Sequence, residues 1–290
     1  MKSDEIQIRD PFIFVNDGVY YLYGSTDADI WKGAGRGFTA YKGTDLENWQ
    51  CLGNVFDRPE GYWGTINFWA PEMHAYNGSY YLFASFKAEG VCRGTAVLKS
   101  DSPEGPFRPW SSGAVTPKDW ECLDGTLYVE DGKPYIIFCH EWVQIGDGEI
   151  CLMPLTDDLS APAGEPVKLF SASEAKWPIQ VHHRSSGRDG YVTDGPNMLK
   201  TEYGLFMLWS SKSASGYAIG TAKSETGKIA GPWRQIDKPV FDKDGGHGMV
   251  FKGLDGKSYL TIHTPNHTPD ERPIFIQVEP TEDGLKIKGK

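Results

Sequence analysis

Apolar and polar positions along the chain follow a pattern that recurs five times. Each copy holds a short run of β-branched and aromatic residues, a turn that contains Gly, and a second aromatic run. The second runs span residues 19–23, 79–83, 135–138, 205–209 and 258–262. Short aromatic runs on both sides of a Gly turn predict β-hairpins rather than helices.

Four of the copies continue with a third β-rich run, at residues 37–41, 94–98, 149–153 and 216–220, and then with a short tail. A sheet of three or four strands cannot bury both faces alone, so repeated small sheets stack on one another. Five such copies without helical periodicity are typical of propeller blades. We therefore predict an all-β fold, a five-bladed β-propeller, that forms one domain over residues 1–290.

Composition narrows the range of partners. The net charge of -10 argues against nucleic acid, because phosphate binding needs clustered Lys and Arg. No stretch approaches the roughly 20 apolar residues of a membrane span, so we expect no membrane partner. A neutral substrate is compatible with the dispersed acidic charge.

The five cysteines are odd in number and lack metal-type spacing. Cys139 and Cys151 lie in or beside apolar runs, which predicts buried, reduced thiols. Reduced cysteines and a start without a signal-peptide pattern favour a cytoplasmic location, or a secreted or periplasmic one if a signal peptide has been removed.

Polar residues open several of the first strands. Three copies carry an aspartate at the same place, where the first strand begins: Asp10, Asp124 and Asp194. Together with His247 they stand seven to nine positions before the turns of their copies. The innermost strands of a propeller line its central channel, so we predict that these side chains converge on one funnel. A lone aspartate at a strand start often bonds its own backbone, but like charges crowded near one axis are costly without a purpose.

Three carboxyl groups in one funnel suit the hydrolysis of a glycosidic bond. Inversion needs a carboxylate that activates water and a carboxylic acid that protonates the leaving oxygen, roughly 6.5–9.5 Å apart. A third carboxylate close to the acid keeps that acid protonated through like-charge repulsion.

The motifs around these residues resemble those of glycoside hydrolase family 43, over nearly the whole chain. The resemblance implies that Asp10 is the general base, that Asp124 tunes and orients the acid, and that Asp194 is the general acid. It also implies that His247 lies near the channel and helps to hold a calcium ion or a water cluster.

One departure concerns the acid, because Asp194 stands where the family usually has Glu before Gly-Pro. An aspartate carboxyl lies about 1.5 Å, one C–C bond, further back. Glu72 and Glu141 are the alternative proton donors, although the intact Gly195-Pro196 favours Asp194.

Further residues are candidates for substrate binding, since sugar sites combine stacking aromatic rings with hydrogen-bonding side chains. Trp69 and Glu72 open the second copy, and blade packing or a solvated strand end are the alternative roles for them. His140, Glu141 and Trp142 follow the second strand of the third copy, where an ordinary loop is the alternative.

Arg272 is a candidate partner of Asp124 because the resembled family often has a late arginine near the channel. A surface ion pair is the alternative for it. His182 and His183 lack a third metal ligand at usable spacing, which favours a loop.

The predicted function is an inverting, exo-acting glycosidase, and within the family an α-L-arabinofuranosidase. β-Xylosidase, β-galactofuranosidase and endo-arabinanase activities use the same fold and stay open. A sugar-binding propeller without hydrolysis is the alternative of another class, motivated by the shortened acid.

Overall fold

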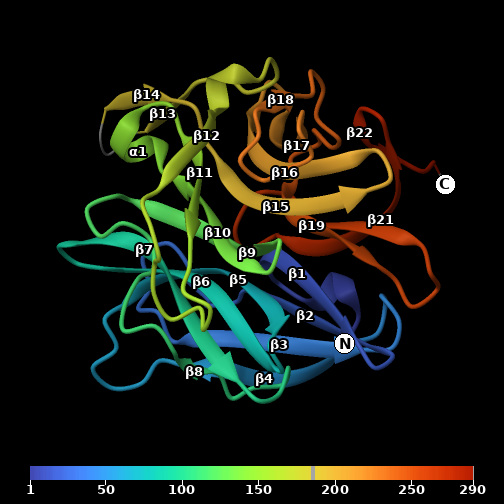
Figure 1. Ribbon diagram of the computed structural model, residues 1–290. Helices are drawn as coiled ribbons and strands as arrows, with labels where there is room; N and C mark the ends of the chain where they lie inside the picture. Colours follow the sequence, from blue (N-terminus) through green and yellow to red (C-terminus); the bar gives the residue numbers. More distant parts are fainter. Residues whose placement is uncertain (184–186, 290) are drawn as a thin grey trace.

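The computed structural model describes residues 1–183 and 187–289, and strands dominate it (Figure 1). The chain forms five four-stranded antiparallel sheets, each made of four consecutive strands. Blade 1 contains β1 (Arg9–Asn16), β2 (Val19–Ser25), β3 (Gly37–Gly43) and β4 (Gln50–Asp57). Blade 2 contains β5 (Ile66–Tyr76), β6 (Ser79–Ala88), β7 (Val91–Ser100) and β8 (Arg108–Pro109). Blade 3 contains β9 (Cys122–Glu130), β10 (Lys133–His140), β11 (Glu149–Pro154) and β12 (Val167–Ser171).

The other two blades complete the ring. Blade 4 contains β15 (Asp194–Thr201), β16 (Gly204–Ser213), β17 (Gly216–Ser224) and β18 (Trp233–Gln235). Blade 5 contains β19 (Gly246–Lys252), β20 (Ser258–Thr264), β21 (Arg272–Thr281) and β22 (Gly284–Ile287). The first strands contact one another in the order β1, β5, β9, β15, β19 and back to β1, which confirms the predicted five-bladed propeller.

Short elements connect or flank the blades. They are the 3-10 turns η1 (Ser3–Glu5) and η2 (Ala172–Glu174), the helix α1 (Trp142–Ile145) and the hairpin of β13 (Val181–His183) and β14 (Arg188–Gly190). No helix in the described part of the chain is long and apolar enough to cross a membrane. The predicted tails are turns that lead into the fourth, outer strand of each blade.

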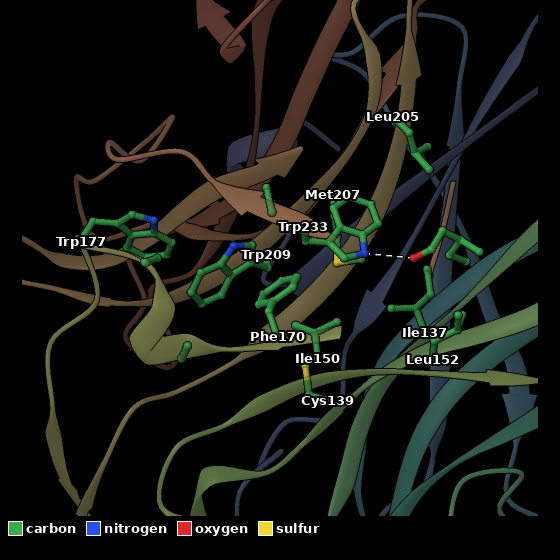
Figure 2. Close-up of a cluster of buried hydrophobic side chains, with 14 of the residues drawn as sticks. Ile137, Cys139, Ile150, Leu152, Phe170, Trp177, Leu205, Met207, Trp209 and Trp233 are labelled. Carbon is green, nitrogen blue, oxygen red and sulfur yellow. Dashed lines mark hydrogen bonds between the residues drawn. The ribbon is translucent and has the colours of Figure 1, made fainter. Parts of the chain in front are cut away.

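Large aromatic and aliphatic side chains fill the space between blades. Figure 2 shows one such cluster, in which Ile137 and Phe170 of blade 3 meet Met207 and Trp209 of blade 4. Trp209 is fully buried, and Cys139 and Cys151 are buried free thiols as predicted. Burial on both faces explains why the second strands are so rich in aromatic residues.

The ring closes by packing of blade 5 on blade 1 rather than by a strand shared between them. Strand β1 lies against β19, and η1 lies against β21. The Arg272 guanidinium donates from Nε to the carbonyl oxygen of Asp4 at 2.8 Å. Ile6 and Ile8 are buried in one cluster with Phe251 of blade 5.

Every blade begins with the same break in strand register. In each first strand a two-residue irregularity contains one residue in the left-handed region, with φ of 54° at Asp10, 46° at Ala70, 57° at Asp124, 52° at Gly195 and 47° at His247. Asp and His tolerate this conformation better than most residues, and bulges re-aim side chains. The repeated bulge therefore turns one residue of each blade toward the channel.

Candidate active site

A cavity of about 780 Å³ opens at the end of the channel where the first strands begin. All five blades line it, and its lining includes seven of the predicted residues: Asp10, Trp69, Asp124, Glu141, Trp142, Asp194 and His247. The predicted convergence of the strand openers on one funnel is therefore present in the structure.

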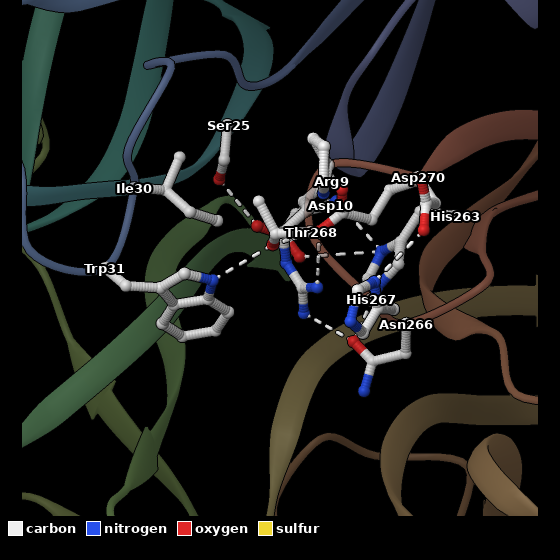
Figure 3. A network of polar contacts seen from close by, with 12 residues as sticks. Arg9, Asp10, Ser25, Ile30, Trp31, His263, Asn266, His267, Thr268 and Asp270 are labelled. Carbon is white, nitrogen blue, oxygen red and sulfur yellow. Dashed lines mark hydrogen bonds and ion pairs between the residues drawn. The ribbon is translucent and has the colours of Figure 1, made fainter.

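Asp10 is buried and held on both carboxyl oxygens. The Ser25 hydroxyl donates to Oδ2 at 2.5 Å, and Nδ1 of His247 lies 3.2 Å from Oδ1 (Figure 3). The backbone N–H of Asp10 donates to Nδ1 of His263 at 3.1 Å, so that ring nitrogen carries no proton. Burial alone would raise the pKa of Asp10, but His247 and Arg9 outweigh it and hold the pKa below its ordinary value. Asp10 is accordingly an ionised carboxylate.

His247 lies between two of the aspartates. Its Nδ1 is 3.2 Å from Asp10 Oδ1 and 3.6 Å from Asp124 Oδ2. Burial would lower the pKa of His247, yet Asp10, Asp124 and Asp194 together raise it. The imidazole is therefore the positive charge that balances this acidic cluster.

Asp124 has the opposite electrostatic character to Asp10. It is buried, and Gly195 donates its N–H to Asp124 Oδ2 at 2.9 Å. Burial raises the pKa of Asp124, and the neighbouring Asp194 and Asp10 add to this rise against the opposing effect of His247. Like-charge repulsion among Asp10, Asp124 and Asp194 favours a state in which one of these carboxyl groups is protonated.

Asp194 occupies a different register position from the other two aspartates. It pairs with Ser210, as Arg9 pairs with Ser25, whereas Asp10 and Asp124 are the left-handed residues that follow such a pair. The expectation that the three aspartates stand at one equivalent place is thus wrong by one residue. In blade 4 the left-handed position is Gly195, because a Cβ there would come within 2.6 Å of the His247 ring.

The carboxyl of Asp194 faces the cavity and accepts a hydrogen bond from the Tyr217 hydroxyl at 2.9 Å. Burial raises the pKa of Asp194 and Asp10 adds to the rise, against the effects of His247, Tyr217 and Lys212. The pKa values of Asp124 and Asp194 are thus both raised, that of Asp124 to about 8, whereas the pKa of Asp10 is lowered.

A ring of side chains from the second strands fixes the bulges. The N–H of each left-handed residue donates to a side chain of the preceding blade, and the pairs are Asp10 with His263, Ala70 with Ser25, Asp124 with Ser85 and His247 with Ser210. In blade 3 the equivalent second-strand residue is Cys139, and Gly195 donates to Asp124 instead. This hydrogen bond ties the first strand of blade 4 directly to Asp124.

A family model for "Glycosyl hydrolases family 43" matches residues 5–285 of this chain. The chain belongs to glycosyl hydrolases family 43. It is therefore a glycoside hydrolase, and the cavity described above lies at the end of a family 43 propeller.

Solved structures and characterised proteins resemble this family 43 chain over most of its length. The crystal structure of an endo-arabinase from Bacteroides thetaiotaomicron has a TM-score of 0.90 and 39% identity, with 98% of each chain covered. An endo-1,4-beta-xylanase structure from the same organism has a TM-score of 0.78 and 25% identity, covering 98% of this chain and 95% of that one. An extracellular exo-alpha-(1->5)-L-arabinofuranosidase from Cellvibrio japonicus is 24% identical over 90% of this chain and 80% of its own length.

Aromatic residues form two walls of the family 43 cavity. On the side of blades 1 and 2, Trp31 and Trp69 meet edge to face with ring centroids 5.3 Å apart, and the Arg93 guanidinium lies 4.1 Å from the Trp69 ring. On the side of blades 3 and 4, Trp142 and His183 meet in the same way at 5.3 Å. The predicted loop around His183 is instead the strand β13, and His183 lines the cavity.

A polar clasp of five residues, Arg9, Trp31, Asn266, Thr268 and Glu271, joins blades 1 and 5. Figure 3 shows the first four of them near Asp10. Arg9 donates to Glu271 at 3.0 Å and to Asn266 at 2.6 Å, and Trp31 Nε1 donates to Thr268 Oγ1 at 3.0 Å. Glu271 is fully buried. Its carboxyl is paired with the guanidinium of Arg9 and accepts a hydrogen bond from the hydroxyl of Thr268. The clasp bounds the cavity on this side.

Three predicted substrate-binding residues lie outside the cavity lining found among the described residues. Glu72 is buried deeper in the channel, with Oε2 3.5 Å from His74 Nε2. His140 stacks on Trp120 at 4.2 Å. Arg272 donates to the carbonyl oxygens of Asp4, Pro269 and Glu271, so its predicted pairing with Asp124 is wrong. The buried arginines at the site are Arg9 and Arg93, each beside a buried glutamate.

Glu141, the other alternative acid, lines the cavity but is paired with the guanidinium of Arg93. Burial raises the pKa of Glu141, whereas Arg93 lowers it. The net effect is a raised pKa, and the ion pair occupies one carboxyl oxygen, so Glu141 stays the alternative proton donor.

The calcium ion predicted near His247 stays a prediction. No group of three or more His, Cys, Asp or Glu side chains suited to a metal ion occurs within residues 1–183 and 187–289. Nδ1 of His247 lies 3.2 Å from Asp10 Oδ1 and 3.6 Å from Asp124 Oδ2, so this ring nitrogen is already engaged by two carboxyl groups. No step proposed below uses a metal.

Several residues at the site had no functional prediction, namely Arg9, Arg93, Lys212, Tyr217, Asn266 and Thr268. Arg9 could have been found, since it precedes Asp10 in the motif. Tyr217 and Arg93 lie on third strands, whose placement relative to the channel depends on how neighbouring blades pack.

Proposed function

We propose that the protein is an inverting, exo-acting α-L-arabinofuranosidase that removes terminal pentose units from arabinose-containing polysaccharides or oligosaccharides. The observation that carries the proposal is the contrast between two carboxyl groups in one cavity. Asp10 has a lowered pKa and Asp194 a raised one, which suits a base and an acid.

The proposed reaction is a single displacement. Asp194 gives its proton to the glycosidic oxygen as the C–O bond breaks, so the leaving sugar departs with a new hydroxyl. A water molecule attacks the anomeric carbon from the opposite face, and its proton passes to the carboxylate of Asp10. Asp124 stabilises the protonated state of the cluster, and His247 balances the charge of Asp10.

Two features support arabinose as the sugar and the chain end as the point of attack. The Bacteroides structure and the Cellvibrio enzyme are both named for arabinose-containing substrates, the second of them for exo action. The clasp of Trp31 with Thr268 bounds one side of the cavity, which favours a substrate that enters by its end. The exposed Trp31 and the half-buried Trp142 offer flat faces for sugar rings.

Endo-arabinanase action is the second candidate, because the endo-arabinase structure shares 39% identity with this chain. The two modes differ in the products of linear arabinan. Exo action releases arabinose from the start of the reaction, whereas endo action first yields mixed oligosaccharides.

The decisive experiment combines a substrate panel with two acid variants. Nitrophenyl α-L-arabinofuranoside, β-D-xyloside and β-D-galactofuranoside, together with linear arabinan, are assayed with the wild type, Asp194→Ala and Glu141→Gln. We expect turnover of the arabinofuranoside, arabinose as the first product of arabinan, and loss of arabinan hydrolysis in Asp194→Ala. Retention in Asp194→Ala with loss in Glu141→Gln would move the acid to Glu141. Binding of arabinan without turnover would favour a sugar-binding propeller.

Inversion is tested by NMR of the first product. Before mutarotation, the anomeric configuration of the released sugar should be opposite to that of the substrate.

The Cellvibrio relative is named as extracellular, which supports the secreted alternative for this protein.

A further inference from the structure

Tyr217 is a buried tyrosine at the start of the third strand of blade 4, and its hydroxyl reaches the candidate acid. It donates to Oδ2 of Asp194 at 2.9 Å, and only 2% of the residue is exposed. A buried hydroxyl with one fixed partner defines the geometry of that partner.

Blade 5 holds Tyr217 in place on several sides. The ring stacks on His263 with centroids 5.7 Å apart and planes at 23°. The backbone N–H of Tyr217 donates to Asp244 Oδ1 at 3.1 Å, and its carbonyl accepts the N–H of Gly245 at 2.9 Å. At Gly246 a Cβ would lie 2.9 Å from the ring, so only glycine allows this approach. Tyr217 is thus a rigid anchor across the seam between blades 4 and 5.

The anchor also connects the two candidate catalytic groups. His263, on which the Tyr217 ring stacks, accepts the backbone N–H of Asp10 at 3.1 Å. Asp194 in blade 4 and Asp10 in blade 1 are therefore both hydrogen-bonded to the same stacked pair, Tyr217 and His263. Such a frame fixes the distance and direction between two groups that must act on opposite faces of one sugar.

We propose that Tyr217 is a positioning residue for the acid: its hydroxyl occupies Oδ2 of Asp194, so that the transferable proton resides on Oδ1. This inference rests on the proposed function, in which Asp194 protonates the leaving oxygen. With an aspartate in place of the longer glutamate, the carboxyl has fewer rotatable bonds, and one hydrogen bond suffices to select the oxygen that faces the substrate.

The charges around Asp194 come from several blades. The groups that face it are Tyr217, Lys212, His247, Asp10, Asp124 and Glu141. Burial raises the pKa of Asp194, and the Tyr217 hydroxyl opposes this rise by stabilising the ionised carboxylate. Loss of the hydroxyl should therefore raise the pKa of the acid while it frees the carboxyl to turn.

Lys212 provides a way to separate charge from orientation. Its Nζ lies 4.9 Å from the centroid of the Tyr217 ring, and its charge also lowers the pKa of Asp194. A Lys212→Met substitution removes this charge but leaves the Tyr217 hydroxyl on Oδ2.

The test is Tyr217→Phe, with Tyr259→Phe as a matched control. Tyr259 donates its hydroxyl to Asp255 at 2.8 Å, far from the cavity, so its substitution removes the same kind of bond elsewhere. For each variant we would measure kcat/KM on arabino-oligosaccharides and on nitrophenyl arabinofuranoside across pH, and the melting temperature.

We expect Tyr217→Phe to lower kcat/KM about 10- to 100-fold on oligosaccharides, whose leaving group needs the proton. The loss on the nitrophenyl substrate should be less than about threefold, because its leaving group needs little protonation. The basic limb of the pH profile should move upward by about one unit. Lys212→Met should move the basic limb but keep the ratio between the two substrates.

An equal loss on both substrates with an unmoved basic limb would overturn the proposal and leave Tyr217 a structural role. Wild-type kinetics in Tyr217→Phe would overturn it as well. If the wild type itself hydrolyses neither substrate, the proposed function fails rather than the role of Tyr217.

Discussion

Asp10 in blade 1 and Asp194 in blade 4 lie in the same cavity, yet the two carboxyl groups are in opposite electrostatic states. Asp10 touches the imidazole of His247 and the hydroxyl of Ser25, and its pKa is lowered. Asp194 touches one neutral hydroxyl, and its pKa is raised by burial. The difference arises from neighbours rather than from residue type.

Register produces this difference in neighbours. Asp10 is the left-handed residue of its bulge, and Asp194 precedes the left-handed residue of its own. A shift of one residue along a strand turns a side chain toward another face. One repeated bulge therefore presents the candidate base from blade 1 and the candidate acid from blade 4.

The largest effect is expected from Asp10→Asn, which keeps the shape of the side chain but removes the base. Turnover should fall by about 10²–10⁴-fold or more on every substrate, because water activation does not depend on the leaving group. Substrate affinity should remain, as measured by calorimetry with an arabino-oligosaccharide. Turnover within about tenfold of the wild type would show that another group accepts the proton.

Asp194→Asn should affect the two kinds of substrate unequally, unlike Asp10→Asn. We expect a loss of about 10²–10⁴-fold on arabino-oligosaccharides but a much smaller loss on the nitrophenyl glycoside, which leaves without a proton. The measurement is the ratio of kcat/KM for the two substrates. A ratio equal to that of Asp10→Asn would mean that Asp194 is not the acid.

Ser25→Ala should sharpen the comparison through pH. The Ser25 hydroxyl stabilises the ionised form of Asp10, so its removal raises the pKa of that carboxyl. Activity should then be lost at higher pH as the solution is acidified, with the acidic limb moved up by about one unit.

Ser85→Ala is the matched control for Ser25→Ala. Both serine oxygens accept a backbone N–H, Ser25 that of Ala70 and Ser85 that of Asp124, each at 2.8 Å. Ser25 also donates its hydroxyl to the carboxylate of Asp10, which is the bond under test. Ser85→Ala should lower the melting temperature without moving the acidic limb. An equal shift in both variants would assign the effect to the bulges rather than to the Ser25 hydroxyl.

The smallest effect concerns the same bulge in blades 2 and 4. Ala70 has a φ of 46°, and Ala70→Gly should stabilise the fold by about 1 kcal/mol through relief of the left-handed strain. Gly195→Ala should destabilise it by more than that, since the added Cβ meets the His247 ring. Denaturant unfolding of both variants measures the free-energy changes, and a destabilised Ala70→Gly would contradict the strain.

The hairpins and the propeller could be predicted because each second strand is aromatic and follows a turn with Gly. The outer strands were harder to predict from the sequence, since segments such as Arg108–Pro109 and Trp233–Gln235 are too short to show an alternation of apolar and polar residues. The hairpin of Val181–His183 also lacks the aromatic pattern, which is why a loop was predicted there.

At the site, sequence identified the residues that open the first strands, because their motifs are contiguous. It did not identify their register, since a bulge adds an unpaired residue without a sequence signature of its own. Tyr217 and the clasp of Arg9 with Glu271 depend on contacts between blades that are far apart in the chain. Contacts of this kind are set by packing and cannot be read from local pattern.

Blade 5 closes the ring by packing on blade 1, so the order in which the blades are synthesised matters for activity. Asp10 emerges from the ribosome in the first blade, whereas the two imidazoles beside it, His247 and His263, emerge in the last. A nascent chain therefore carries the candidate base and Arg9 long before it carries His247, which helps to hold the pKa of that buried carboxyl below its ordinary value. Competence should appear in one step, when blade 5 docks on blade 1, so the onset of activity during translation would report the moment of closure.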